Sequence, residues 1–191
     1  MMKAILFLAI QLMALVCQAQ FSHPGMLHNS ADLELVRQKV NNGEEPWKSA
    51  YADLQNSDMA SLNWVAKPVD NVVVGYYSLP NIGGTAFWND GDAAYSLTLR
   101  WYISQDKAYA EKAIEILNAW SSTMDSITHD NRKWHLGTGG ITFLNAAEII
   151  RHTYKGWKKK DQQAFENLVL NFWFPVLEPF QPDFNGNWHI R

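Results

Sequence analysis

The stretch DAAYSLTLRWYISQDKAYAEKAIEILNAW, residues 92–120, predicts two consecutive amphipathic helices. The first is expected over residues 93–104 with Asp92 as its N-terminal cap, and the second over residues 108–120 after a two-residue link. Apolar residues recur three and four positions apart in both segments, which puts them on one face of each helix. They are Ala94, Leu97 and Trp101 in the first helix and Ala110, Ala113, Ile114, Leu117 and Trp120 in the second. The pair is therefore expected to pack as a helical hairpin.

A second pair of helices is expected further along the chain, over residues 140–154 and 161–177, with Pro175 bending the end of the last one. Short sequence motifs of the first helix pair recur in the second pair at an offset of roughly fifty residues. Leu99-Arg100 returns as Ile150-Arg151, and Leu117-Asn118-Ala119-Trp120 returns as Leu170-Asn171-Phe172-Trp173. Repeated helical hairpins are typical of solenoids and α/α toroids, in which each hairpin buries its apolar face against its neighbours. The predicted fold class is all-α, with hairpins forming part of an incomplete (α/α) toroid; chance or ordinary convergence of helical hairpins is the alternative explanation of the repeat.

Two shorter helices are expected on the N-terminal side. Asn29 or Ser30 can cap a helix that runs to about Val40, and Asn41-Asn42-Gly43 should end it. Pro46 suits the first turn of the next helix, because proline lacks only an N–H that would have no helical partner there.

Two segments are predicted to be irregular. Residues 57–89 carry three Gly and two Pro, with one β-like run at residues 72–74. A loop of this length commonly forms the wall or lid of a site. Gly137-Thr138-Gly139-Gly140 is predicted to be a tight turn that lets backbone segments pack closely.

The N-terminus predicts export. Lys3 precedes an apolar run, residues 4–17, that is too short to span a bilayer and is followed by small residues, as in a secretory signal peptide. We expect residues 1–19 to be the signal peptide and residues 20–191 the mature domain, in the periplasm or secreted and off the membrane after cleavage. Lipid attachment at Cys17 is the less favoured alternative, because no small residue precedes it.

Composition narrows the class of function. Cys17 is the only cysteine, so the mature chain has no disulfide, thiol nucleophile or cysteine-bound zinc. The net charge of −3 argues against nucleic acid as a partner. Nine Trp are many for one domain, and several stand beside polar residues, as in clefts that stack on sugar rings and bind their hydroxyls. Trp101, Trp120 and Trp173 are instead expected to fill helix interfaces.

Motifs for other chemistries are lacking. The chain has no His-x-x-x-His word, no carboxylate cluster at ligand spacing and no Gly-x-Ser-x-Gly elbow, so no metal and no cofactor is expected. For His23 and His28, surface or capping roles are favoured over ligation. Arg100 and Arg151 recur in the repeat and are expected to have structural roles, such as binding carbonyls at helix ends.

Five short sequence motifs, in order along the chain, resemble the N-terminal part of the alginate lyase family. They are His23-Pro24-Gly25-Met26-Leu27-His28, Pro46-Trp47-Lys48-Ser49-Ala50-Tyr51, the stretch from Asp92 to Ser121, Asn145-Ala146-Ala147-Glu148-Ile149, and Asn185-Gly186-Asn187-Trp188. The resemblance implies an α/α toroid that cleaves an acidic polysaccharide, alginate or another polyuronate, by β-elimination.

The same resemblance assigns the catalytic site. Asn187 matches the residue that neutralises the substrate carboxylate, with Trp188 packing or stacking beside it and His189 as the second catalytic candidate. A plain turn at Asn185-Gly186-Asn187 is the alternative. Family members often carry an acidic residue where this chain has His189. No tyrosine is assigned, because Tyr76, Tyr77, Tyr95 and Tyr102 lie in no matched motif for that role. The remaining Tyr, His and Arg of the site are expected beyond residue 191, and His189 is either a local substitute or a sign that the sequence is interrupted there.

Other polar and aromatic residues are candidates for binding sugar. Trp88-Asn89-Asp90 and Trp134-His135 are expected in loops beside helices, where Trp88, Trp134 and His135 would line subsites; ordinary loop packing is equally compatible. Two further functions stay open. One is a non-catalytic helical module that binds glycan or protein, and the other is a hydrolase that would need a carboxylate pair from among three acids. These are Asp90, Asp92 and Asp183.

Overall fold

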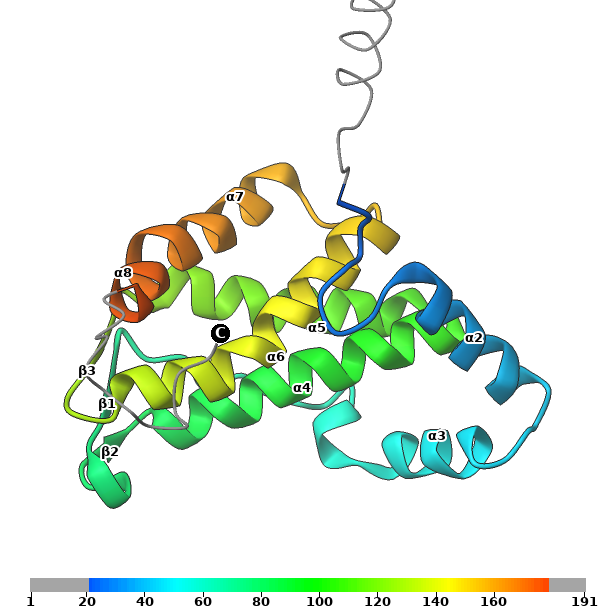
Figure 1. The fold of residues 1–191 in the computed structure, drawn as a ribbon, viewed down its shortest axis with the longest axis horizontal. Helices are drawn as coiled ribbons and strands as arrows, with labels where there is room; N and C mark the ends of the chain where they lie inside the picture. The colour runs from blue at the N-terminus through cyan, green and yellow to red at the C-terminus, as the bar shows by residue number, and fades with distance from the viewer. Residues whose placement is uncertain (1–20, 179–191) are drawn as a thin grey trace, which may run out of the picture.

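The computed structural model describes residues 21–178 (Figure 1). The N-terminal side holds α2 (Ser30–Asn41), α3 (Trp47–Asn56), a 3-10 turn (Asp58–Ala60), β1 (Asn71–Val74), a 3-10 turn (Tyr76–Ser78) and β2 (Asn81–Ile82). The rest holds α4 (Gly84–Ser104), α5 (Lys107–Thr123), β3 (Ser126–Thr128), α6 (Arg132–Thr153), α7 (Lys159–Leu168), a π-helical segment (Val169–Trp173) and α8 (Phe174–Leu177). The all-α class is confirmed, whereas closure into a toroid stays a prediction. None of the helices between residues 21 and 178 combines the length and apolar character that a membrane crossing requires.

Three long helices make the centre of the structure. Helix α4 packs against both α5 and α6, while α7 packs on α5 and α2 lies against α4 (Figure 1). The first predicted hairpin is therefore α4–α5, whereas in the second predicted pair, α6 and α7, helix α7 packs on α5 rather than on α6. Asp106 caps α5, and its side chain accepts a hydrogen bond from the amide of Ala108.

Four buried aromatic rings from the two hairpins meet in the core. The edges of Trp120 and Trp173 lie against the ring of Phe87, with centroid distances of 5.3 and 5.6 Å. Both tryptophans also contact Phe143, at 5.9 Å each, and the two phenylalanines lie 5.0 Å apart. The repeat thus places its two tryptophans in equivalent surroundings. The prediction that Trp101, Trp120 and Trp173 pack between helices is confirmed, since all three are buried.

Helices α4 and α6 begin earlier than the sequence predicts. Helix α4 starts at Gly84, so the prediction of a cap at Asp92 is wrong, and α6 starts at Arg132 and runs through the four residues predicted to be a turn. The glycines there serve helix contact. A Cβ on Gly139 would lie 2.0 Å from Cδ1 of Trp88, and one on Gly91 would lie 2.5 Å from the Thr142 hydroxyl. Close approach of α4 to α6 therefore requires glycine, and this packing overrides its poor helix propensity.

The N-terminal predictions hold better. Asn29 caps α2 by accepting hydrogen bonds from the amides of Ala31 and Asp32, and Asp32 accepts one from the amide of Asn29 in return. Helix α3 begins at Trp47, directly after Pro46. The β-like run is strand β1, the centre of a small sheet in which it pairs antiparallel with β2 and parallel with β3.

Candidate functional site

The residues matched to the catalytic word fall outside the part of the chain that the structure describes. Asn187, Trp188 and His189 lie beyond residue 178, as does Asp183, and the predicted signal peptide lies before residue 21. The candidate site is therefore built from α4 and α6, which carry the predicted substrate-binding residues.

The structure brings Trp88, Trp134 and His135 together. Trp88 lies on α4 and the other two on α6, so the prediction that these residues lie in loops is wrong. The indole of Trp88 stacks on the imidazole of His135 with centroids 4.3 Å apart, and the Trp134 ring meets Trp88 edge-on at 5.1 Å. The Trp88 Nε1–H also donates to the His135 carbonyl at 3.1 Å. Both tryptophans are half-buried.

His135 is the buried member of this group of three rings. It is only 3% exposed, and its Nε2–H donates to the carbonyl of Gly84 at 2.9 Å. Burial lowers the pKa of His135, which the bond to Gly84 partly opposes. A neutral imidazole that donates from Nε2 holds the ring in place under Trp88. His135 thus fixes the orientation of the Trp88 ring and presents little surface of its own.

A row of polar side chains continues from the tryptophans along the seam between α4 and α6. Asp92 follows Trp88 by one helical turn and faces Thr142, and Tyr95 follows by two turns. Loss of solvent beside α6 raises the pKa of Asp92, while the hydrogen bond with Thr142 opposes the shift. Burial also raises the pKa of Tyr95, whose hydroxyl bonds to Nε2 of His28. Sequence reasoning missed Asp92 and Tyr95 as neighbours of Trp88, because the spacing is visible only if the helix is extended back to Gly84.

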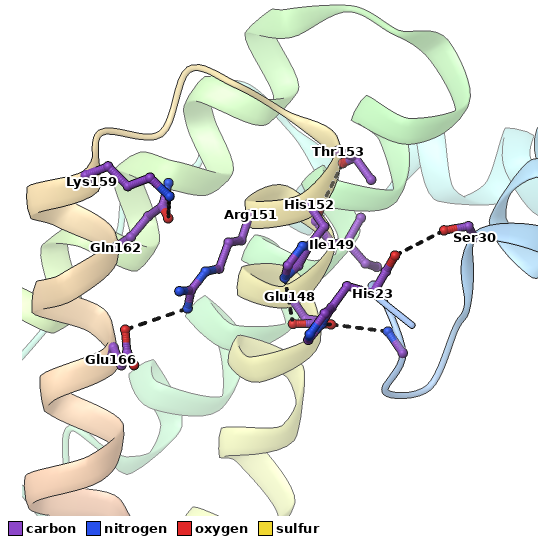
Figure 2. A network of polar contacts seen from close by, with 11 residues as sticks. His23, Ser30, Glu148, Ile149, Arg151, His152, Thr153, Lys159, Gln162 and Glu166 are labelled. Carbon is purple, nitrogen blue, oxygen red and sulfur yellow. Dashed lines mark hydrogen bonds and ion pairs between the residues drawn. The ribbon is translucent and has the colours of Figure 1, made fainter. Parts of the chain in front are cut away.

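The far end of the seam holds a His–Glu–His cluster that joins residues 21–29 to α6. Nδ1 of His23 lies 2.6 Å from Oε1 of Glu148, and Nε2 of His152 lies 3.6 Å from Oε2 of the same carboxylate. The two imidazole rings stack with centroids 4.1 Å apart (Figure 2). Beside this cluster, Asn145 accepts a hydrogen bond from the amide of Leu27. The expectation that His23 has only a surface or capping role is thus incomplete.

Two other predicted roles can be assigned. Arg100 donates to the carbonyl of Ala60, the last residue of a 3-10 turn, and lies over the ring of Tyr109, which fits a structural role. Asp90 is 1% exposed and is not a loop acid. Its carboxylate accepts hydrogen bonds from the indoles of Trp64 and Trp120 and from the amide of Lys67, at 2.9, 2.8 and 2.7 Å. The core therefore uses both oxygens of Asp90, which removes it from a hydrolytic carboxylate pair.

Comparison with known proteins gives one match. A family model described as alginate lyase matches residues 83–178, which is 96 of the 191 residues and runs from the start of α4 to the end of α8. Searches among curated proteins and among solved structures gave no match. The matched region contains the two core hairpins and both ends of the α4–α6 seam.

Proposed function

The chain belongs to the alginate lyase family, and on that basis we propose that it is an exported lyase that cleaves alginate or a related polyuronate by β-elimination. The observation that carries the proposal is the coincidence of the family match with the two helices whose seam presents Trp88 and Trp134. Half-buried indole rings beside hydroxyl and carboxyl groups suit a sugar ring, whose faces are apolar and whose edge carries hydroxyls.

The chemistry of a polyuronate sets what such a site needs. Removal of the C5 proton builds negative charge on the adjacent carboxylate, so the enzyme must direct hydrogen-bond donors at that group. A base must take the C5 proton, and an acid must protonate the leaving glycosidic oxygen. The bond between C4 and that oxygen breaks as a C4–C5 double bond forms. The products are a new sugar end and an unsaturated uronate.

We assign the neutralising role to Asn187, with His189 as its partner and Trp188 stacking or packing beside them. An amide side chain can donate two hydrogen bonds to the developing charge without itself taking part in proton transfer. Trp88 and Trp134 would hold a neighbouring sugar unit, with His135 fixing the Trp88 ring. The signal peptide proposed for residues 1–19 would deliver the protein to the periplasm or beyond, where polymeric uronates are encountered.

The test is to incubate the protein with a panel of polyuronates and follow ultraviolet absorbance from the new C4–C5 double bond. We expect absorbance to rise with alginate or another member of the panel. Asn187→Ala should abolish the rise and leave thermal unfolding unchanged, while Asn171→Ala, at an exposed position in the π-helical segment, serves as the matched control. Absence of product from every polymer would overturn the lyase proposal.

A non-catalytic glycan-binding module is the second candidate. It is favoured by the nature of the seam, which within residues 21–178 presents stacking rings and hydroxyls suited to binding. The same panel distinguishes the two functions: a module would retain a polyuronate on an affinity gel and release no unsaturated product.

A further inference from the structure

The His23–Glu148–His152 cluster brings together three metal-ligating side chains from two distant parts of the chain. His23 lies in the segment before α2, whereas Glu148 and His152 lie one turn apart on α6. One possible ligand atom from each residue lies within 4.8 Å of the other two. We propose that these three residues form a binding site for a divalent transition metal ion, with Zn²⁺ as the ion that suits them best.

The types of ligand select this class of ion. Two imidazoles and one carboxylate are a common protein ligand set for zinc, whereas Ca²⁺ and Mg²⁺ prefer oxygen ligands throughout. Three protein ligands leave a fourth position of a tetrahedral ion to water or to an incoming ligand. The single carboxylate supplies the negative charge that partly offsets the charge of the ion.

The cluster must tighten to hold an ion, because its three ligand atoms lie within 4.8 Å of one another and the two shortest separations involve different oxygens of Glu148. Ligand atoms in a tetrahedral zinc site with bonds of about 2.0 Å lie about 3.3 Å apart. The separation of 3.6 Å between His152 Nε2 and Glu148 Oε2 is already near that value. The separation of 2.6 Å between His23 Nδ1 and Glu148 Oε1 is that of a hydrogen bond and must widen by less than an ångström. The side chain of His23 is 46% exposed, so its ring has room to turn out of the stack and direct Nδ1 at the ion.

Binding also requires a change of proton position on His23. When Nδ1 donates to Glu148, that nitrogen carries the ring proton, and a metal ligand needs its lone pair. The ring therefore takes the other tautomer, in which solvent supplies a proton to Nε2 and accepts the one leaving Nδ1. The exchange is balanced and leaves the imidazole neutral.

Neighbouring residues hold the Glu148 carboxylate in place, and the guanidinium of Arg151 is directed away from it. The amide of Gly25 donates to Oε1 of Glu148 at 3.2 Å, which fixes one oxygen of the ligand. Arg151 is next to His152 in sequence, yet its guanidinium points to Glu166 on α7 at 3.7 Å and away from the cluster (Figure 2). Lys159 is the other nearby cation, and its ammonium lies 3.5 Å from Oε1 of Gln162.

A bound ion would fasten residues 21–29 to the C-terminal part of α6. Without an ion, the segment is held there by hydrogen bonds to Glu148 and Asn145. An ion that binds only the folded chain stabilises it by mass action. The cluster does not include Trp88, Trp134 or the proposed catalytic residues. The metal-site proposal, which rests on its own residues, can therefore be tested and rejected independently of the proposed lyase activity.

The test uses the full chain without a polyhistidine tag, in a Cys17→Ser background that removes its one thiol. After treatment with a chelator, titration calorimetry with ZnCl₂ should show one ion per chain. Thermal denaturation should show that ZnCl₂ raises the unfolding temperature. Co²⁺ should give the visible absorption of a four-coordinate ion. His152→Gln and His23→Gln should each weaken Zn²⁺ affinity at least about tenfold, since even residues that only orient ligands have effects of that size.

His129→Gln is the matched control, because His129 is an exposed histidine that also lies beside a carboxylate, that of Asp130, but outside the cluster. It should leave Zn²⁺ affinity unchanged. Circular dichroism in the absence of metal should show that all three variants keep their helical content. The proposal is overturned if the unsubstituted chain does not bind Zn²⁺, or if His152→Gln and His23→Gln bind it as the control does.

Discussion

Trp120 and Trp173 pack against the same phenylalanine, Phe87, but within residues 21–178 only the indole of Trp120 has a hydrogen-bond partner. The Nε1–H of Trp120 donates to Asp90 at 2.8 Å. The Nε1–H of Trp173, whose side chain is buried at 2% exposure, meets no acceptor among the described residues. Equivalent packing thus coexists with a polar contact that only the first hairpin makes.

This difference predicts unequal effects of the same substitution. Trp120→Phe removes a donor from the buried Asp90 carboxylate and should destabilise the chain by about 1–3 kcal/mol more than Trp173→Phe, which removes an N–H without a partner in the described part of the chain. Urea denaturation followed by circular dichroism measures both. Equal losses of stability would show that the hydrogen bond to Asp90 contributes nothing beyond packing.

Neighbouring glycines of α6 should respond in opposite ways to alanine. A Cβ on Gly139 would meet Trp88 at 2.0 Å, so Gly139→Ala should cost about 1–3 kcal/mol and displace the Trp88 ring. Gly140 has its nearest neighbour at 3.4 Å, so Gly140→Ala should be neutral or stabilise by up to about 1 kcal/mol through helix propensity. Thermal unfolding of both variants, with tryptophan fluorescence as a probe of Trp88, tests the pair.

Stability should fall in acid because of His135. Burial lowers its pKa in the folded state below the ordinary value of 6.5, so below that pH the unfolded chain binds more protons than the folded one. The free energy of unfolding therefore decreases as the pH falls from 6.5 toward the lowered pKa, by at most about 1.4 kcal/mol per pH unit from this group. His135→Gln should flatten this part of the stability–pH curve, measured by urea denaturation between pH 5 and 7.

Sugar binding, if it takes place on the α4–α6 seam, should depend on Trp134. Trp134→Ala removes a ring that meets Trp88 edge-on and should weaken retention of a polyuronate by about tenfold, which corresponds to the 1.4 kcal/mol within reach of one aromatic contact. Trp47→Ala is the control, because Trp47 is half-buried on α3 under Lys39 and lies away from the seam. Affinity electrophoresis in gels that contain the polymer gives the comparison. The seam is not the binding surface if both variants migrate as the unsubstituted chain does.

The spacing of apolar residues predicts the paired helices, but it places the N-terminal ends of two of them wrongly. The apolar spacing around Leu97 and Leu117 predicts α4 and α5, and the capping role of Asn29 follows from its own side chain. The sequence predicts later starts for α4 and α6 than the structure shows, because Gly84 and Gly139 have low helix propensity. Their helical state depends on a partner helix that approaches too closely for any side chain at Gly139.

By itself, the sequence determined the helical class, the core tryptophans and the resemblance to alginate lyases, since each depends on residues within a few turns or on short words. The tertiary structure alone decided that Trp88 stacks on His135, that Asp90 belongs to the core, and that His23 meets Glu148 and His152. Residues 23 and 148 are 125 positions apart, and no local pattern links them. They meet because hydrogen bonds to Glu148 and Asn145 hold the segment before α2 against α6.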